Sequence, residues 1–356
     1  MNYIGSKYSL LPFIDECIVK ITGNKPSTFC DLFAGTGVVG KYFKRKGYRI
    51  IANDIQYYSY VLNRQYITNH KILLFKGLET EIPELNNVLF KENKIEVVCN
   101  YLNRLNGVKG FVYNNFCAGE KEKENQRLYY TNENGAKCDT IRIKIQQWYN
   151  ESKITEEEYF FLLATLIENV DKVANTASVY GAFLKKIKAS AQKPLTMKPV
   201  EMIYNNQEYE VYNEDANKLV RKIKTDILYL DPPYNQRQYS ANYHVLETIA
   251  KYDNPLLKGK TGMRDYSNQK SDYCNKRKVK DTFEDLIMNA DAKYIFLSYN
   301  NEGLLTFDEI KEIMTEKGEY GYFSVQYNRF KADNESKTRH IKANFTTEYL
   351  HYVVCK

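Results

Sequence analysis

The residues best suited to chemistry form the run Asp231-Pro232-Pro233-Tyr234, directly after the apolar segment 226–230. The aspartate carboxylate and the carbonyl of Pro232 can each accept one N–H bond from an exocyclic amine, whose lone pair is otherwise delocalised into an aromatic ring. These two bonds favour a tetrahedral nitrogen with its lone pair aimed at an electrophilic methyl group. The prolines fix φ, which lowers the entropy cost of presenting the carbonyl, and Tyr234 can stack on a base that has left its duplex. A plain proline turn is the alternative, but the run favours methyl transfer to an amino nitrogen.

A second candidate set follows an upstream strand-like segment and reads Asp31-Leu-Phe33-Ala-Gly35-Thr-Gly37. Glycines after a buried strand allow close approach of a ligand to the backbone and a sharp turn into a helix. The pattern lacks the full dinucleotide fingerprint, and an acidic Asp31 suits a cationic amine better than a pyrophosphate. Nicotinamide and flavin binding are therefore disfavoured, and glycines that serve only the turn are the structural alternative.

A third candidate, Asp54, ends the next strand-like segment, about 20 residues further on. Doubly wound folds place a carboxylate at this position to bind ribose hydroxyls. A helix N-cap is the alternative role. The spacing from the glycine turn favours a nucleotide-shaped cofactor.

The elements that must position these residues alternate between helix and strand. Residues 8–22 have helical periodicity, 28–33 form a strand, 35–47 a turn and helix, 49–53 a strand, and 57–69 a helix. This order predicts a parallel sheet with right-handed crossovers. Further predictions are a helix from Thr155 to about Ala174 opened by a capping box with Glu158, strands at 208–212, 226–230 and 294–298, and a closing antiparallel pair at 321–327 and 348–354.

Composition sets broad limits on the function. The chain has 356 residues, 43% of them hydrophobic, and a formal net charge of +7, which permits a polyanionic partner without requiring one. Its seven cysteines and four histidines are scattered without metal-ligand spacing, so no metal is expected. The longest apolar stretch, 159–167, is too short to span a bilayer, and we expect a soluble intracellular protein with no membrane partner.

In this order the motifs resemble the D12-class adenine-N6-specific DNA methyltransferases of bacterial type II restriction–modification systems. The N-terminal counterpart is Asn2-Tyr-Ile-Gly-Ser-Lys7, and family-like blocks also occur at 235–248 and 298–303. The resemblance covers most of 1–75 and 210–356. It implies an α/β fold: a Rossmann-like S-adenosylmethionine-dependent methyltransferase sheet with an antiparallel closing strand and a largely helical inserted target-recognition region.

The resemblance also implies roles for individual residues. It places Tyr3, where some members have Trp, and Lys7 against S-adenosylmethionine, Asp54 on its ribose, Asp215 on its adenine, and Asp231 between cofactor and target amine. The full set expected to bind the cofactor is Tyr3, Lys7, Asp31, Phe33, Gly35, Gly37, Asp54, Asp215 and Asp231.

By the same resemblance, residues 1–75 and 205–356 form the catalytic domain and residues 76–204 an inserted target-recognition region. Basic residues in the insertion and beyond the catalytic run are candidates for phosphate contacts, with solvated surface charges as the alternative. Arg237 and Tyr239 are candidates for holding a flipped base or its flanking phosphates. The remaining DNA-binding candidates are Lys185, Lys186, Lys188, Lys258, Lys260, Arg264, Lys276 and Arg277.

The leading hypothesis is methyl transfer from S-adenosylmethionine to adenine N6 in double-stranded DNA, by base flipping and direct in-line displacement. Cytosine-N4 methylation is the nearest alternative, since its amine is similar, although Ser in place of Asp231 would favour it more. An RNA or protein amine, or an inactive DNA-binding relative, fits the intact motifs less well. Expected partners are duplex DNA and a cognate restriction endonuclease acting on the same site without a stable complex, in the bacterial cytoplasm at the nucleoid.

Overall fold

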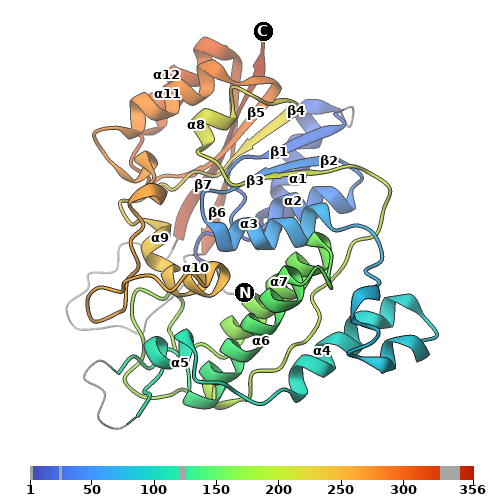
Figure 1. The fold of residues 1–356 in the computed structure, drawn as a ribbon. Coiled ribbons are helices and arrows are strands. Elements are labelled where there is room, and N and C mark those ends of the chain that lie inside the picture. Colours follow the sequence, from blue (N-terminus) through green and yellow to red (C-terminus); the bar gives the residue numbers. More distant parts are fainter. Residues whose placement is uncertain (1–2, 24–25, 121–125, 329–344) are drawn as a thin grey trace. The chain divides into compact units, whose positions relative to one another are not determined.

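The computed structural model describes residues 3–23, 26–120, 126–328 and 345–356, which form two compact units. Unit 1 comprises the described residues of 1–4, 61–207 and 240–266, and unit 2 those of 5–60, 208–239 and 267–356. Residues 61–75 and 240–266 therefore group by compactness with the segment 76–204. Figure 1 shows the elements of both units along the chain.

Unit 2 contains a seven-stranded sheet with the order β3-β2-β1-β4-β5-β7-β6. The first five strands in this order are parallel to one another, whereas β7 runs antiparallel to both β5 and β6. The predicted α/β class and the closing antiparallel pair are thus confirmed. The strands are β1 (Thr28–Asp31), β2 (Arg49–Asn53), β3 (Glu210–Tyr212), β4 (Lys224–Leu230), β5 (Asp291–Asn300), β6 (Gly318–Asn328) and β7 (Phe345–Cys355).

Strand order reverses between β1 and β4, because the chain first builds β2 and β3 on one side of β1 and later places β4 and β5 on the other. In open α/β sheets ligands bind at such a switch point, beyond the carboxyl ends of the strands. Asp31 ends β1, and Asp231 directly follows β4. The topology therefore brings both acidic motifs predicted from the sequence to this edge.

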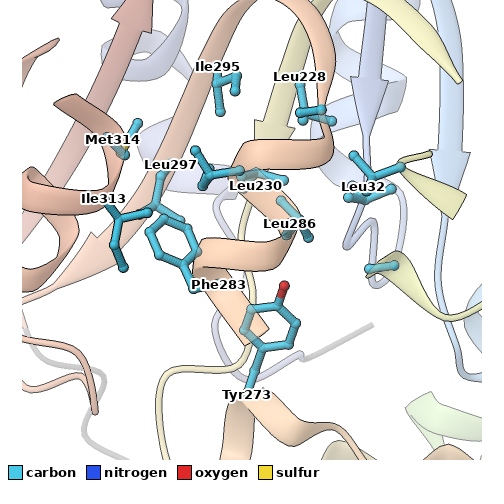
Figure 2. Close-up of a cluster of buried hydrophobic side chains, with 14 of the residues drawn as sticks. Leu32, Leu228, Leu230, Tyr273, Phe283, Leu286, Ile295, Leu297, Ile313 and Met314 are labelled. Carbon is cyan, nitrogen blue, oxygen red and sulfur yellow. The ribbon is translucent and has the colours of Figure 1, made fainter. Parts of the chain in front are cut away.

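Side chains alternate between the two faces of the sheet, as the period of a strand requires. On one face, Leu228, Leu230, Ile295 and Leu297 pack against helices α8, α11 and α12, and Figure 2 shows Phe283 and Leu286 of α11 within this cluster. On the other face, Phe29 stacks on Phe43 of α2 with ring centroids 4.2 Å apart. Each fully buried side chain of this size stabilises the fold by about 2 kcal/mol. The helices of unit 2 are α1 (Leu11–Thr22), α2 (Val38–Arg45), α8 (Ala216–Leu219), α11 (Val279–Asn289) and α12 (Phe307–Lys317).

Unit 1 is helical. The predicted helix 155–174 is confirmed as α7, with both hydrogen bonds of the Thr155–Glu158 capping box present. Trp148 of α6 is fully buried and donates from its indole to Glu81 over 3.1 Å. Its helices are α4 (Lys94–Arg104), α5 (Phe111–Phe116), α6 (Asn132–Asn150), α7 (Glu156–Lys172) and α10 (His244–Lys251); the chain passes between units within α3 (Tyr57–Asn63) and α9 (Tyr239–Asn242).

Buried polar side chains join α6 to its neighbours in unit 1. The Asp139 carboxylate accepts from the backbone N–H groups of Val112 and Tyr113, both at 2.8 Å, at the start of α5. The Arg142 guanidinium donates to the carbonyls of Ile249 and Ala250 near the C-terminal end of α10, where a positive charge also complements the helix dipole. The segment inserted between the sheet strands thus supports the helix that follows the Asp231 run.

In the described part of the chain, no helix combines the length and the apolar character needed to cross a membrane.

Candidate functional site

The glycine turn after β1 has the geometry that its sequence predicts. Gly35 and Gly37 adopt φ values of 51° and 76°, in the left-handed region that favours glycine, and Gly37 caps the N-terminus of α2. The Gly35 N–H donates to Oδ2 of Asp54 over 2.9 Å. The turn and the carboxylate predicted to bind ribose are therefore in direct contact.

Asn53, immediately before Asp54, joins the ends of three segments. Its side-chain Nδ2 donates to the backbone carbonyls of Leu32 and Glu214, both at 3.1 Å. Its side-chain Oδ1 accepts from the Glu214 N–H at 3.0 Å. The other oxygen of Asp54 accepts from the Gln56 N–H at 2.8 Å. Because both carboxylate oxygens are held by backbone donors, Asp54 has a fixed orientation.

Asp31 is almost completely buried, with 1% of its surface exposed. Burial raises the pKa of its carboxyl to about 8, and the nearby charge of Asp231 adds to this shift, although the Gly40 N–H, 3.2 Å from Oδ2, opposes it. A carboxyl with a pKa this high favours a cationic neighbour, since a positive charge would remove much of the cost of ionising it.

The run after β4 forms a loop in which Pro232 is buried and Tyr234 partly buried. The backbone carbonyl of Tyr234 accepts from the Leu304 N–H over 3.0 Å, and the Tyr234 ring meets the Tyr299 ring edge to face with centroids 6.1 Å apart. A β-carbon on Gly303 would overlap the Tyr299 ring, so glycine is required at that position. The contacts of Tyr299 and Leu304 with Tyr234 therefore help to fix the loop that carries the catalytic candidates.

Lys7 is the cation that contacts both Asp231 and Glu348. Its ammonium lies 3.2 Å from Oδ1 of Asp231 and 2.6 Å from Oε1 of Glu348, and it is 5% exposed. Burial raises the pKa of Asp231 to about 6; Lys7 opposes this shift and Glu348 adds to it. The attraction of the two carboxylates raises the pKa of Lys7 well above its ordinary value, although burial acts in the opposite direction. Lys7 is therefore firmly protonated, while Asp231 titrates close to neutrality.

The candidate for binding the cofactor adenine, Asp215, lies at the start of α8. Asp215 is exposed and caps this short helix, accepting from the Lys218 N–H at 3.1 Å. Phe33 packs edge to face on Tyr273 with ring centroids 5.1 Å apart. The Tyr273 hydroxyl in turn donates to Asn217 of α8 over 2.8 Å.

The segment 267–275 contacts several parts of the site at once. Gln269 donates to the carbonyl of Ile55 at 3.2 Å, just beyond Asp54. The Gln238 side chain makes two hydrogen bonds to the backbone of Ser271, at 3.0 and 2.8 Å. Together with the contacts of Tyr273 to Phe33 and to Asn217 of α8, these bonds link the segments that carry Asp54, Asp215 and the catalytic candidates.

The two aromatic candidates of the N-terminal motif and the catalytic flank lie in different units. Tyr3, in unit 1, stacks on Tyr243 with centroids 4.9 Å apart, and the Ile4 N–H donates to the hydroxyl of the same tyrosine over 2.8 Å. In unit 2, Gly5 has φ 78° and approaches Tyr239 so closely that a β-carbon on it would lie 2.9 Å from the tyrosine hydroxyl. Asn2 lies outside the described residues.

The DNA-binding candidates differ in how exposed they are. In unit 1, Lys258 and Lys260 lie exposed on a tight hairpin closed by two backbone bonds between Lys258 and Met263. Arg264 is 7% exposed, and its guanidinium binds both oxygens of Asp253 at 3.0 and 2.7 Å. The other candidates in unit 1 are Lys185 and Lys186, both exposed, and Lys188, whose ammonium donates to the Thr176 carbonyl at 2.7 Å; those in unit 2 are the exposed Arg237, Lys276 and Arg277.

The structure therefore brings together, in unit 2, the candidates Lys7, Asp31, Phe33, Gly35, Gly37, Asp54, Asp215, Asp231, Pro232, Pro233 and Tyr234. Three further residues that contact this site, Glu348, Gln269 and Tyr273, were not predicted from the sequence. Only Glu348 has a detectable signal, as the one acidic residue in the strand segment 345–355. Among the described residues, no group of three or more His, Cys, Asp or Glu side chains could hold a metal ion.

Comparison with known proteins identifies the family. The sequence model for D12 class N6 adenine-specific DNA methyltransferases matches residues 3–313. The chain is 48% identical over 353 residues to the type II methyltransferase M.NlaIII of Neisseria lactamica, covering 99% of this chain and 98% of that protein. It is 33% identical to M.CviAII of Paramecium bursaria Chlorella virus 1 over 353 residues, with 99% and 98% coverage. Against M.FokI of Planomicrobium okeanokoites it is 38% identical over 362 residues, which is 99% of this chain but only 52% of that protein. The chain belongs to the D12 class of N6 adenine-specific DNA methyltransferases.

Proposed function

We propose that the site at the strand ends of unit 2 uses S-adenosylmethionine as its methyl donor and Asp231 as the principal acceptor for the target amine. The family assignment establishes adenine-specific DNA methylation, and the proposal concerns how these residues carry it out. The observation that supports it most directly is the contact of the buried Lys7 with Asp231, whose charge also acts on Asp31 immediately before the glycine turn.

The donor set fits S-adenosylmethionine. Asp31 is a buried carboxyl that a cation would help to ionise, and S-adenosylmethionine carries both an ammonium and a sulfonium group. Asp54 presents oriented oxygens suited to ribose hydroxyls. Tyr3, Lys7, Phe33, Gly35, Gly37 and Asp215 complete the set proposed to hold it. When bound, this group supplies an electrophilic methyl on a positively charged sulfur.

In the proposed mechanism, the two N–H groups of adenine N6 donate hydrogen bonds, one to the Asp231 carboxylate and one to the backbone carbonyl of Pro232. The nitrogen lone pair is thereby withdrawn from the ring and becomes nucleophilic. Pro232 and Pro233 keep the carbonyl in place, and Tyr234 stacks on the flipped base. Transfer is direct and in line without a covalent enzyme intermediate, and the proton of the methylated amine passes to water. Catalysis here depends on positioning and hydrogen bonding.

We further propose that residues 76–204 supply target recognition and that exposed basic residues contact phosphates. The exposed residues proposed are Arg237, Lys258, Lys260, Lys276, Arg277, Lys185 and Lys186. Lys188, which is partly buried and donates to the Thr176 carbonyl, is proposed with them, and Tyr239 is proposed to lie beside the flipped base. Since Arg264 is buried and paired with Asp253, its role in this proposal is to join the two ends of the segment 253–264, which contains the 258–263 hairpin. The substrate is double-stranded DNA at the bacterial nucleoid in the cytoplasm, and a cognate endonuclease recognises the same site without stable association.

The test incubates the purified protein with methyl-labelled S-adenosylmethionine and mixed unmethylated duplex DNA, beside Asp231→Ala, followed by digestion to nucleosides. Label in N6-methyladenine that disappears with Asp231→Ala, while S-adenosylmethionine binding persists, is the expected result. Label in N4-methylcytosine would assign a different base. Full activity of Asp231→Ala would remove the proposed acceptor role.

Base flipping is tested separately with 2-aminopurine in place of the target adenine. Its fluorescence should rise on binding the protein, because the base leaves the quenching stack. An unchanged signal with demonstrated binding would contradict flipping.

A further inference from the structure

Glu348 delivers a carboxylate to the site from the antiparallel edge of the sheet. It lies near the start of β7, in register with Asn300 at the carboxyl end of β5. Because β7 runs opposite to β5, the start of β7 lies at the edge of the sheet where the parallel strands end. A single reversed strand thus adds an acid to a set otherwise supplied by β1, β2 and β4.

Two donors hold the side chain of Glu348. Its side chain is 6% exposed, and Oε1 accepts from the Lys7 ammonium at 2.6 Å and from the Ser298 hydroxyl at 3.1 Å. An isolated buried carboxylate is strongly disfavoured, and a charged donor with a second hydrogen bond offsets that cost. Glu348 and Asp231 therefore share one cation.

The sharing is unequal. Lys7 lies 0.6 Å closer to Glu348 (2.6 Å) than to Asp231 (3.2 Å). A carboxylate that is fully paired with an ammonium accepts further hydrogen bonds weakly, since its charge is already compensated. By taking the shorter contact, Glu348 leaves more of the negative charge of Asp231 uncompensated.

We propose that Glu348 is a positioning residue for methyl transfer, which competes for Lys7 and so keeps Asp231 available to accept the N–H bonds of the target amine. The inference rests on the proposed role of Asp231. Besides Lys7 and Glu348, the titratable groups that act on Asp231 are Asp31 of β1, Tyr229 of β4 and Tyr234 of the catalytic loop.

The experiment compares pH profiles of kcat for the wild type, Glu348→Gln and Glu348→Asp, with duplex DNA and methyl-labelled S-adenosylmethionine at saturation. In Glu348→Gln the Lys7 charge acts on Asp231 without competition. The acid limb of the profile should move to lower pH by about one unit, and the plateau rate should fall about 10-fold or more, because Asp231 becomes a weaker acceptor. Glu348→Asp, whose carboxylate is withdrawn by one methylene, should show a smaller shift in the same direction.

A charge-matched control is Glu319→Gln, on the exposed surface of β6, which removes one negative charge from the same hairpin. Its acid limb should coincide with that of the wild type. Should Glu348→Gln fail to fold, as judged by circular dichroism, Glu348→Asp carries the test alone. A loss of rate in the folded Glu348 variants without movement of the acid limb would reduce Glu348 to a structural residue and overturn the inference.

Asp231→Asn separates this inference from the proposed function on which it rests. If Asp231→Asn keeps both its rate and its acid limb, the proposed role of Asp231 fails. If Asp231→Asn loses the activity while the Glu348 variants keep the wild-type limb, only the inference about Glu348 fails.

Discussion

Two aspartates at opposite ends of β4 have carboxyl groups with opposite pKa shifts. Asp226 near the start of β4 and Asp231 just after its end are five positions apart, with side chains 14% and 18% exposed. Burial alone would raise the pKa of both carboxyl groups. At Asp226 this effect is outweighed by Lys293 and by the N–H groups of Ser27 and Thr28, so its pKa falls far below the ordinary value. At Asp231 burial prevails, and the pKa rises to about 6.

The difference follows from the number of donors at each carboxylate. Oδ2 of Asp226 accepts from the Ser27 N–H at 2.8 Å, its hydroxyl at 3.0 Å and the Thr28 N–H at 3.1 Å, while Oδ1 pairs with Lys293 at 2.6 Å. Asp231 has a shared Lys7 and the like charges of Glu348 and Asp31 nearby. A carboxylate with satisfied oxygens stabilises the fold, whereas one with acceptor capacity to spare can serve a substrate.

The largest expected effect tests the functional end of β4. Asp231→Ala should lower kcat at least 1,000-fold, equivalent to about 4 kcal/mol of transition-state stabilisation, because the target amine would lose its proposed charged acceptor. Its free energy of unfolding should change little, since the variant loses a buried acid that is incompletely paired. The measurements are single-turnover methyl transfer and urea unfolding. If Asp231→Ala lost much stability but kept its turnover per folded molecule, Asp231 would be a structural residue and not a functional one.

The structural end of β4 should behave in the opposite way. Asp226→Ala leaves the N–H groups of Ser27 and Thr28 without their acceptor and should cost about 2–4 kcal/mol of unfolding free energy. The rate per folded molecule should stay within about 3-fold of the wild type, because the residue is at the end of the strand remote from the site. Chemical denaturation at neutral pH gives the first quantity and active-site titration the second. A stability equal to that of the wild type would show that these donors find water as an equivalent partner.

The pH dependence of stability should distinguish Asp31, whose pKa is raised, from Asp226, whose pKa is lowered. Asp31 has a folded-state pKa of about 8 against an ordinary 3.8, so the folded state holds a proton that the unfolded state releases above pH 4. Its contribution is therefore fully present below pH 4 and is lost as pH rises towards 8, with a slope approaching 1.4 kcal/mol per pH unit. Asp226, with a lowered pKa, contributes stability above pH 4 that is lost in stronger acid.

Urea unfolding of the wild type and Asp31→Asn between pH 4 and 8 measures this term. The difference in unfolding free energy between the two proteins should change steadily over that window in favour of the variant. A constant difference would mean that Asp31 ionises normally in the fold. Asp226→Asn provides the matched comparison, since its difference should stay constant from pH 5 to 8.

Much of the sheet unit could be predicted from sequence because parallel strands are buried on both faces. Runs such as 226–230 are therefore almost continuously apolar, and the residues at their ends stand out. The glycine turn and the closing antiparallel strands were predicted from the sequence pattern, and the family assignment is confirmed. The adjacency of Asp31 to Asp231 depends on the strand order of the sheet, which was not predicted. The binding roles predicted for individual residues remain predictions.

The helix α6 could not be predicted in the same way. In α6 the buried face includes Asn134, Asp139 and Arg142, which interrupt the apolar periodicity on which such predictions depend. These side chains are buried because each finds partners far away in sequence, as Arg142 does at the end of α10. Glu348 escaped notice for a related reason, since its partner Lys7 lies 341 residues away along the chain.

The smallest expected effect concerns the Ser27 hydroxyl, one of several donors to the Asp226 carboxylate. It tests whether the stabilisation by Asp226 is shared among these donors. Ser27→Ala removes only the hydroxyl bond at 3.0 Å and leaves the N–H bond of the same residue at 2.8 Å. It should cost about 0.5–1 kcal/mol of unfolding free energy, well below the cost of Asp226→Ala. In an Asp226→Ala background the same substitution should be silent, because the hydroxyl no longer has a carboxylate to bind, and a double-mutant cycle measures this coupling. If Ser27→Ala alone cost as much as Asp226→Ala, one hydroxyl and not the set of donors would hold the carboxylate, and the contrast with Asp231 would rest on a single bond.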